Sequence, residues 1–265
     1  MSLLDQALTA IGSNGNGLRL LHVGMGQGGE IPGYLALGIE PIGIDGDAKN
    51  IAICEQHYPN VKFYNNVISD KCESLSWHLT HPVECSSVHE IDMEVAKARF
   101  PSIQLVESST VSCVPVDVLL LPQIDGIVVD AQGHDYEVLV GAKETLTTCA
   151  FVICEVWLKM LYKGTTLFND IVSFMDSLGF AMYYFQPGDT PDFWGDAIFV
   201  RRTRIKKKVE RKKPELKPVI KPKLLPKGRS KSIPTTKQRK YHVKHTSAHI
   251  KRIINQRKKL LAERR

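Results

Sequence analysis

Apolar residues fall into two kinds of segment along residues 1–201. Continuous apolar runs of about four to eight residues are typical of buried strands, whereas apolar residues spaced three and four apart are typical of helices. The predicted strands are 18–23, 41–44, 61–64, 124–130, 150–156, 180–185 and 197–201. The predicted helices are an N-terminal helix within 1–17, a short helix around Leu35 and Leu37, and 48–57, 134–146 and 166–178. This alternation predicts an α/β fold with a doubly wound, Rossmann-like sheet.

The last two predicted strands are joined by a segment rich in proline and glycine, QPGDTPDFWG. Such a segment brings the chain back on itself, so we expect this pair to be antiparallel. Nicotinamide-binding sheets usually continue in parallel, whereas methyltransferase sheets end with one reversed strand inserted beside the last parallel one. We therefore expect a mostly parallel methyltransferase sheet with one antiparallel strand near its C-terminal end.

The first strand leads into four closely spaced glycines, in the sequence LRLLHVGMGQGG of residues 18–29. A sharp turn after a strand leaves backbone N–H groups free for a ligand. The second strand ends at Asp45, and in a right-handed unit these two strands are neighbours with a shared crevice. A carboxylate there can accept hydrogen bonds from ribose hydroxyls, so the pattern predicts a nucleoside site. Glycines 24, 26 and 29 fit the dinucleotide spacing, 24, 26 and 28 fit the tighter methyltransferase loop, and a plain turn is the alternative.

Composition then limits the class of protein. The six cysteines form no CxxC pair and no His/Cys cluster at zinc spacing, so they are expected to be reduced thiols, and no metal site is predicted. The N-terminus lacks the basic start and long apolar run of a signal peptide, and no segment has the length of a membrane span. We expect a cytoplasmic protein without a transmembrane segment.

Charge divides the chain near residue 201. Residues 1–200 carry 9 Lys and Arg against 25 Asp and Glu, a net charge of −16, whereas residues 201–265 carry 26 against 3, a net charge of +23. Residues 202–245 are rich in lysine and proline and predict an extended, disordered linker. Residues 246–265 predict a basic amphipathic helix. The expected partners of this basic tail are nucleic-acid phosphates, without sequence readout, or an anionic membrane surface. The alternative is a solvated extension that folds over the acidic domain.

One further segment, IDGIVVDAQGHDYEVLVGAKETL, followed by VICEV, resembles the FkbM-type S-adenosylmethionine-dependent methyltransferases. That family shows D-x-E/Q-G-x-E/D, then a V-L-x-G-A helix, then a strand that ends in Glu-Val. The matching residues here are Asp130, Gln132, Gly133, Asp135, Val138, Leu139, Gly141, Ala142, Glu155 and Val156. The similarity covers roughly residues 18–200.

The resemblance implies S-adenosylmethionine as the cofactor and assigns its contacts. The implied cofactor residues are Gly24, Gly26 and Gly28 in the loop, Asp45 at the ribose, and Ser69 and Asp70 on the adenine side. His22 stands where the family usually has an acidic residue that orients the methionine end, although a histidine can still donate a hydrogen bond to a carboxylate. Gln132 stands where glutamate is commoner.

Methyl transfer to a hydroxyl is an in-line displacement that requires alignment, desolvation and removal of a proton. The acceptor is expected beyond the carboxyl ends of the central strands, within reach of Asp130, His134 and Glu155. His134 is the predicted general base, because an unperturbed histidine has a pKa of about 6.5. Each residue has a structural alternative: Asp130 as a helix cap, His134 as a solvated first-turn residue, and Glu155 as a partner of a backbone amide. A Mg²⁺ ion between Asp130 and Glu155 is not favoured.

Together these observations predict a methyltransferase domain over residues 18–201. The resemblance implies that it acts on a hydroxyl of a glycan or other small molecule. Residues 72–115, with alternation at 74–79 and 104–114 and a helix around 93–100, are expected to wall the acceptor pocket. Two alternatives remain: a non-catalytic protein of the same fold held to nucleic acid by the basic tail, and a nucleic-acid methyltransferase, for which an N-P-P-Y-like motif is lacking.

Overall fold

The computed structural model describes residues 1–205, with the exception of the Arg99 side chain. Most of the predicted linker at 202–245 and all of the predicted helix at 246–265 lie outside the described residues. The helices are α1 (Leu3–Ile11), α2 (Ile31–Ala36), α3 (Ala48–His57), α4 (Met93–Arg99), α5 (Asp135–Gly141), α6 (Lys143–Leu146) and α7 (Phe168–Ser177), with single 3-10 turns η1 (Val83–Cys85), η2 (Val116–Val118) and η3 (Arg202–Arg204). The strands are β1 (Arg19–Val23), β2 (Glu40–Asp45), β3 (Lys62–Asn65), β4 (Val67–Ile68), β5 (Glu73–His81), β6 (Gln104–Val114), β7 (Gly126–Val129), β8 (Phe151–Trp157), β9 (Phe180–Pro187) and β10 (Trp194–Arg201).

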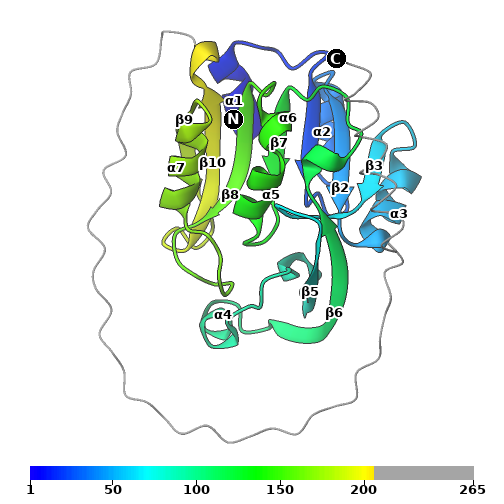
Figure 1. Ribbon diagram of the computed structural model, residues 1–265, viewed down its shortest axis with the longest axis vertical. Coiled ribbons are helices and arrows are strands. Elements are labelled where there is room, and N and C mark those ends of the chain that lie inside the picture. The colour runs from blue at the N-terminus through cyan, green and yellow to red at the C-terminus, as the bar shows by residue number, and fades with distance from the viewer. Residues whose placement is uncertain (206–265) are drawn as a thin grey trace, which may run out of the picture.

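The main sheet has seven strands in the order β3-β2-β1-β7-β8-β10-β9 (Figure 1). β1 pairs in parallel with both β2 and β7, and β7 pairs in parallel with β8. β10 is inserted between β8 and β9 and runs antiparallel to both. The expected mostly parallel sheet with one reversed strand is confirmed. The strand order reverses beside β1, which is where open α/β sheets form their ligand crevice.

Both faces of the sheet are covered by helices, because successive side chains of a strand point to opposite faces. In β1, Leu20 packs with α1 and α2, whereas Leu21 packs in the cluster that contains residues of α5, α6 and α7. In β8, Ile153 packs in the same cluster as Leu20, and Val152 packs in the same cluster as Leu21. Strands buried on both faces explain why the sequence shows continuous apolar runs and no alternation there.

The prediction of one continuous helix over 134–146 is wrong. α5 ends at Gly141 and α6 begins at Lys143, and Ala142 between them has φ −108° and ψ 13°. The Asp117 carboxylate accepts hydrogen bonds from the backbone N–H groups of Glu144 (2.7 Å) and Thr145 (2.8 Å). These bonds satisfy the free donors of a new helix start. A contact between distant segments therefore sets a break that helical spacing cannot reveal.

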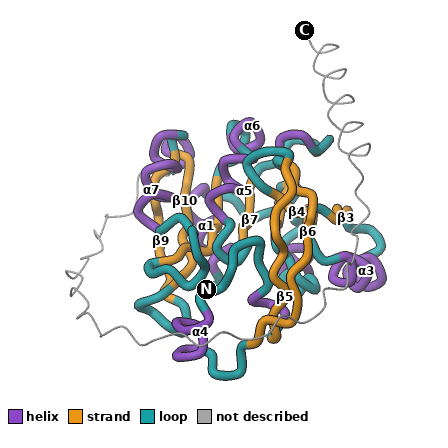
Figure 2. Tube along the Cα trace, turned by 60° about the horizontal axis from the view of Figure 1, so that its bottom comes forward, coloured by secondary structure: helices purple, strands orange, loops and turns teal. Residues whose placement is uncertain are grey.

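Residues 66–115 leave the main sheet after β3 and form a second sheet in the order β4-β6-β5. β5 and β6 are antiparallel, and α4 lies on the segment between them, so the expected alternations and helix in this region are confirmed. Figure 1 shows α4, β5 and β6 projecting beyond one end of the main sheet, and Figure 2, in which this end comes forward, shows β6 beside β4. We call residues 66–115 the inserted sheet region.

The helices of the main domain are short. α1 has 9 residues and α3 and α7 have 10 each. Within residues 1–205, no helix combines the length and the apolar character needed to cross a membrane. The cytoplasmic location inferred from the sequence stays a prediction.

Candidate active site

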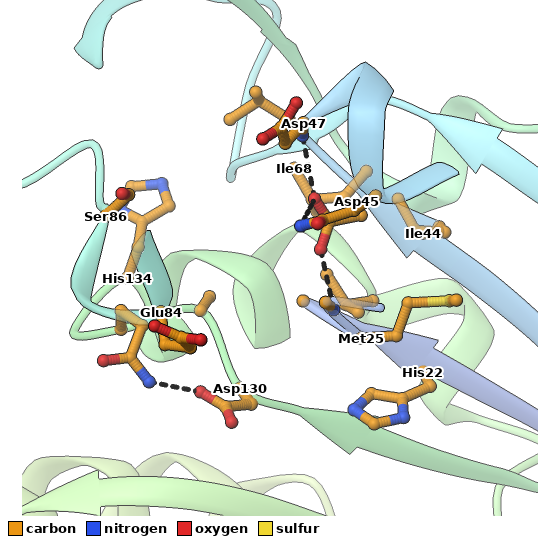
Figure 3. A pocket seen from close by; sticks show the side chains of 18 of the residues that line it. His22, Met25, Ile44, Asp45, Asp47, Ile68, Glu84, Ser86, Asp130 and His134 are labelled. Atoms are coloured by element: carbon orange, nitrogen blue, oxygen red, sulfur yellow. Dashed lines mark hydrogen bonds between the residues drawn. The ribbon is translucent and has the colours of Figure 1, made fainter. Parts of the chain in front are cut away.

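A cavity of about 340 Å³ opens at the carboxyl ends of β1, β2 and β7. Its wall comes from the loops after these three strands and from the inserted sheet region. The predicted site residues that line it are His22, Gly24, Gly26, Asp45, Asp130 and His134. Figure 3 shows Asp45 and Met25 on one side of this space and Glu84, Asp130 and His134 on the other. The cavity thus brings together six residues drawn from segments more than 100 positions apart in the chain.

The glycine loop after β1 contributes two of its three predicted residues to the cavity. Gly24 has φ 79°, and a Cβ there would lie 1.7 Å from the Asp130 carbonyl oxygen. Gly26 has φ 55°, and a Cβ there would meet nothing within 4 Å, so this glycine faces open space. Gly28 does not line the cavity: a Cβ there would lie 2.7 Å from Ile31 Cδ1, because this glycine packs against α2.

Asp45 ends β2 and faces this loop. Its carboxylate accepts hydrogen bonds from the backbone N–H groups of Gly26 (2.9 Å) and Asp47 (2.8 Å) and from Asn50 Nδ2 (3.2 Å). Burial raises the pKa of Asp45 above its usual value, and the three hydrogen bonds oppose that shift. A carboxylate offers about four acceptor sites, so one remains for a ligand hydroxyl. A second hydroxyl could replace the long bond from Asn50.

His22 lies on β1 in the cavity wall. Its Nδ1 is 3.1 Å from the Tyr34 hydroxyl oxygen. Burial lowers the pKa of His22 to about 4, so the ring is neutral at pH 7. When the Tyr34 hydroxyl donates to Nδ1, the ring proton is on Nε2. His22 can then donate a hydrogen bond to a ligand carboxylate, but it brings no positive charge.

The opposite side of the site is built around Gln132, which follows β7 and has a φ of 50°. Its Nε2 donates to Asp130 Oδ1 at 2.6 Å and lies 3.4 Å from Glu155 Oε2. The Tyr162 hydroxyl donates to Gln132 Oε1 at 2.9 Å. An amide at this position bridges two acids, whereas a glutamate could donate to neither when ionised.

Several carboxyl groups share this side of the site. Although Asp130 is exposed to the cavity, desolvation by the surrounding protein raises its pKa to about 6, and Asp196 is raised to a pKa of about 6 in the same way. Burial raises the pKa of Asp135 to about 7 and that of Glu155 well above its usual range, and repulsion between the acids adds to these shifts. Glu155 lies behind Gln132 and does not line the cavity.

The helix-cap alternative for Asp130 is not what the structure shows. The backbone N–H groups of Ala131 and Gly133 donate to the Asp135 carboxylate, at 2.8 Å and 3.0 Å. Asp135 therefore holds the turn before α5, whereas the Asp130 carboxylate accepts its hydrogen bond from a side chain, Gln132.

His134 precedes α5 and is buried, so it is not a solvated residue. Its Nε2 lies 3.1 Å from Ser69 Oγ, and its Nδ1 lies 3.0 Å from His89 Nε2. Burial lowers the pKa of His134 to about 4. The Ser69 hydroxyl also donates to Asp70 Oδ1 at 3.3 Å. Ser69 contacts His134 directly and Asp70 contacts it through Ser69, but neither residue lines the cavity. Val67 and Ile68, which precede them in the chain, do line it.

The inserted sheet region supplies a wall whose individual residues could not be chosen from the sequence. Trp77 on β5 and Val83, Glu84, Ser86 and Val88 around η1 line the cavity. Residues 72–115 are expected to wall the acceptor pocket; these five line the present cavity, and their contact with an acceptor stays a prediction. Their spacing matches no binding motif, so only the fold identifies them.

Comparison with known families identifies the family of the chain. Residues 11–182 match the model of the methyltransferase FkbM domain. The chain belongs to the FkbM methyltransferase family. The match includes β1, β2, β5 and β7, and therefore the strands that carry the cavity. The resemblance identified in the sequence is confirmed. No curated protein sequence gives a significant match.

Solved methyltransferase structures are similar at low sequence identity. The FkbM methyltransferase from Methylobacillus flagellatus KT aligns at 12% identity and a TM-score of 0.47, over 69% of this chain and 43% of that protein. Magnesium protoporphyrin IX methyltransferase (ChlM) from Synechocystis PCC 6803, solved with S-adenosylmethionine, aligns at 14% identity and a TM-score of 0.45, over 73% of this chain and 74% of that one. The 1,6-didemethyltoxoflavin-N1-methyltransferase of Burkholderia thailandensis, solved with S-adenosylhomocysteine, aligns at 10% identity and a TM-score of 0.42, over 74% and 76% of the two chains. The chain thus spans less than half of the Methylobacillus protein.

Proposed function

We propose that this FkbM-family protein uses S-adenosylmethionine to methylate a hydroxyl group of a glycan or other small molecule. The observation that carries the proposal is a single cavity lined by the glycine loop, Asp45 and Asp130. A donor site and a proton acceptor then share one space at the switch point of the sheet. Membership of the family supports methyl transfer as the class of reaction.

The residues on the β1 and β2 side fit the parts of this donor. Gly26 presents an open face, and Asp45 has an acceptor site for a ribose hydroxyl. Neutral His22 can donate a hydrogen bond to the methionine carboxylate. For the adenine ring we assign the apolar wall of Val67 and Ile68, next to the predicted Ser69 and Asp70.

When bound, S-adenosylmethionine supplies a methyl group from its sulfonium, which an acceptor oxygen takes in line. The acceptor hydroxyl must lose its proton, and we assign this role to Asp130. A pKa of about 6 makes Asp130 a stronger base than an ordinary aspartate and leaves it ionised at pH 7. Gln132 orients it through the 2.6 Å hydrogen bond. His134, expected to be the base, is a weaker one because its pKa is about 4 and both ring nitrogens have partners.

The donor site is tested by titrating S-adenosylmethionine into the full chain by calorimetry. We expect Asp45→Ala to weaken binding at least 100-fold, about 2.7 kcal/mol, because it removes the ribose acceptor and releases the Gly26 N–H. Asp45→Asn keeps the shape and separates loss of charge from loss of packing. Glu55→Gln, an exposed carboxylate change on α3, is the control and should bind normally. Equal affinity in all variants would reject the assignment.

The acceptor class is tested by label transfer from S-adenosylmethionine to separate pools of glycans, small hydroxylated metabolites and RNA. Label in a glycan or small-molecule pool supports the proposal. Label in RNA alone supports the nucleic-acid methyltransferase alternative. No label in any pool, with normal donor binding, supports the non-catalytic alternative.

A second role is favoured by charge. Residues 201–265 carry a net charge of +23 beside a domain of −16. We propose that this tail binds nucleic-acid phosphates without sequence readout, since each neutralised phosphate releases a counterion. Retention of the full chain on immobilised RNA should fall steeply with salt and be lost in a chain that ends at residue 205. Retention on anionic vesicles alone would favour the membrane alternative, and no retention at low salt would favour a solvated extension.

A further inference from the structure

Three side chains of metal-binding type meet beside the cavity, from two segments far apart in the sequence. They are His89, between η1 and α4, and His134 and Glu137, at the start of α5. His134 Nδ1 lies 3.0 Å from His89 Nε2 and 3.4 Å from Glu137 Oε2, and His89 Nε2 lies 4.0 Å from Glu137 Oε2. One ligand atom of each residue therefore lies close to one common point.

The other ring nitrogen of His89 fixes its tautomer. His89 Nδ1 lies 3.0 Å from the carbonyl oxygen of Lys163. A carbonyl oxygen can only accept a hydrogen bond, so Nδ1 carries the ring proton. Neutral His89 then has its lone pair on Nε2, the nitrogen that faces His134.

His134 is oriented in a similar way. The Ser69 hydroxyl donates to the Asp70 carboxylate, so its oxygen is free to accept from His134 Nε2–H at 3.1 Å. Neutral His134 then has its lone pair on Nδ1, which faces His89. Glu137 Oε2, beside both rings, is buried and has no hydrogen-bond partner. His89 Nε2, His134 Nδ1 and Glu137 Oε2 thus each offer a lone pair, with no hydrogen between them. A bound cation would accept all three lone pairs.

We propose that His89, His134 and Glu137 bind a divalent transition-metal ion, with zinc as the ion that fits best. Tetrahedral zinc with bonds of about 2.0–2.2 Å separates its ligand atoms by about 3.3–3.6 Å. The three observed separations, 3.0, 3.4 and 4.0 Å, lie on both sides of this range. Imidazole ligands favour zinc, nickel or copper over magnesium or calcium. The Lys163 carbonyl and the Ser69 hydroxyl supply the hydrogen bonds that hold metal-bound imidazoles in place.

The ion joins the inserted sheet region to α5. The chain around His89 is already held there, because Ser87 Oγ donates to the Gln132 carbonyl oxygen at 2.8 Å and the Lys163 N–H donates to the Glu90 carbonyl oxygen at 2.8 Å. Ser86 and Val88, next to His89, line the cavity. Bound metal therefore fixes this part of the cavity wall. This inference stands independently of the proposed methyl transfer.

The test is metal binding to the full chain after chelator treatment. Zn²⁺ is titrated by calorimetry and Co²⁺ by visible absorption, in wild type, His89→Ala and Glu137→Gln. We expect one tight site in wild type that is weakened at least 100-fold in each variant, with loss of the absorption of tetrahedral Co²⁺. Ser69→Ala removes the hydrogen bond that orients His134, together with the one to Asp70, and should weaken binding about 10–100-fold. Mg²⁺ should not compete.

The chain has nine histidines, so total zinc uptake alone proves nothing. His57→Ala and Glu55→Gln on α3 are matched controls, because both residues are exposed and lie outside the cluster. They should bind zinc as wild type does. Thermal unfolding in chelator checks that each variant folds, and added zinc should raise the midpoint in wild type and the controls only. If wild type, His89→Ala and Glu137→Gln give the same isotherms, the proposal is wrong and the two histidines are a hydrogen-bonded pair. S-adenosylmethionine affinity in the same proteins reports separately on the donor site.

Discussion

The two sides of the cavity are built in different ways. The side of β1 and β2 is made by residues 22–50 and by the first residues of the inserted sheet region, 66–68, and backbone N–H groups and Asn50 hold Asp45. The side of β7 and the inserted sheet region is made by residues from 77–88 and 130–138, backed by Glu155 and Tyr162. On the first side Asp45 accepts three hydrogen bonds and keeps one acceptor site for a ligand. On the second, several acids are buried close together, and desolvation and mutual repulsion raise their pKa values.

The two sides are therefore suited to different tasks. The first side is suited to hold a ligand, and the second is suited to accept a proton. An aspartate with three hydrogen bonds is fixed in place and suited to a neutral hydroxyl. An aspartate that accepts a hydrogen bond from one side chain, is exposed to the cavity and has a pKa of about 6 is suited to accept a proton near neutral pH.

The largest effect is expected at Gly24, where the two sides touch. Gly24→Ala places a methyl group 1.7 Å from the Asp130 carbonyl oxygen at a φ of 79°. Steric overlap and backbone strain together should lower the free energy of unfolding by roughly 2–6 kcal/mol. Urea denaturation measures the loss.

Gly29→Ala is the matched control in the same loop. Gly29 has no positive φ, and a Cβ there meets nothing within 4 Å. Its stability should stay within about 0.5 kcal/mol of wild type. Equal losses at both glycines would show that the loop does not depend on contact with Asp130.

The second prediction concerns the proposed base. Asp130→Asn keeps the hydrogen bond from Gln132 but cannot take a proton, so kcat should fall about 100- to 10,000-fold with the donor affinity unchanged. In wild type, only ionised Asp130 is active. The value of kcat/KM should therefore rise with pH through about 6 and then level off.

Asp170→Asn, an exposed change on α7, is the control and should keep full turnover. Turnover of Asp130→Asn equal to wild type, or a flat pH profile between pH 5 and 7, would contradict the assignment.

The smallest effect is expected at Gln132, whose side-chain amide contacts both Asp130 and Glu155. Gln132→Glu replaces the donor to Asp130 and Glu155 with another carboxylate, and should cost about 1–3 kcal/mol of unfolding free energy at pH 8. Glu155→Gln removes an acid from the same place and should add roughly 1 kcal/mol at pH 8, the energy of about one unit of pKa shift.

The pH dependence of the free energy of unfolding distinguishes an effect of charge at positions 132 and 155 from an effect of packing. The folded-state pKa values of Asp130, Asp135 and Asp196 are raised to about 6 to 7, so the folded protein binds more protons than the unfolded chain between about pH 4 and 7. Their contribution to stability is present at low pH and lost as pH rises through this window. Both substitutions at 132 and 155 should therefore have little effect at pH 4. Equal effects at pH 4 and pH 8 would show that charge is not the cause.

Sequence spacing was most informative where the structure is local. The run from Leu18 to Asp45 predicts strand, glycine turn, helix and strand, and the right-handed connection then brings Asp45 to Gly26. The same local logic failed at Ala142, because the helix there is interrupted by a carboxylate from η2. The glycine spacing also placed Gly28 among the cofactor contacts, although this glycine packs against α2 and does not line the cavity.

The α/β fold, the family, the first half of the cavity and the opposite charges of residues 1–200 and 201–265 could be predicted from the sequence, because each depends on residue types at short or fixed spacing. The folded chain was needed to show that Gln132 joins Asp130 to Glu155, that His134 is buried against His89, and which residues of the inserted sheet region wall the site. These are contacts between segments up to 45 residues apart, and burial at those contacts sets the pKa values on which the chemistry depends.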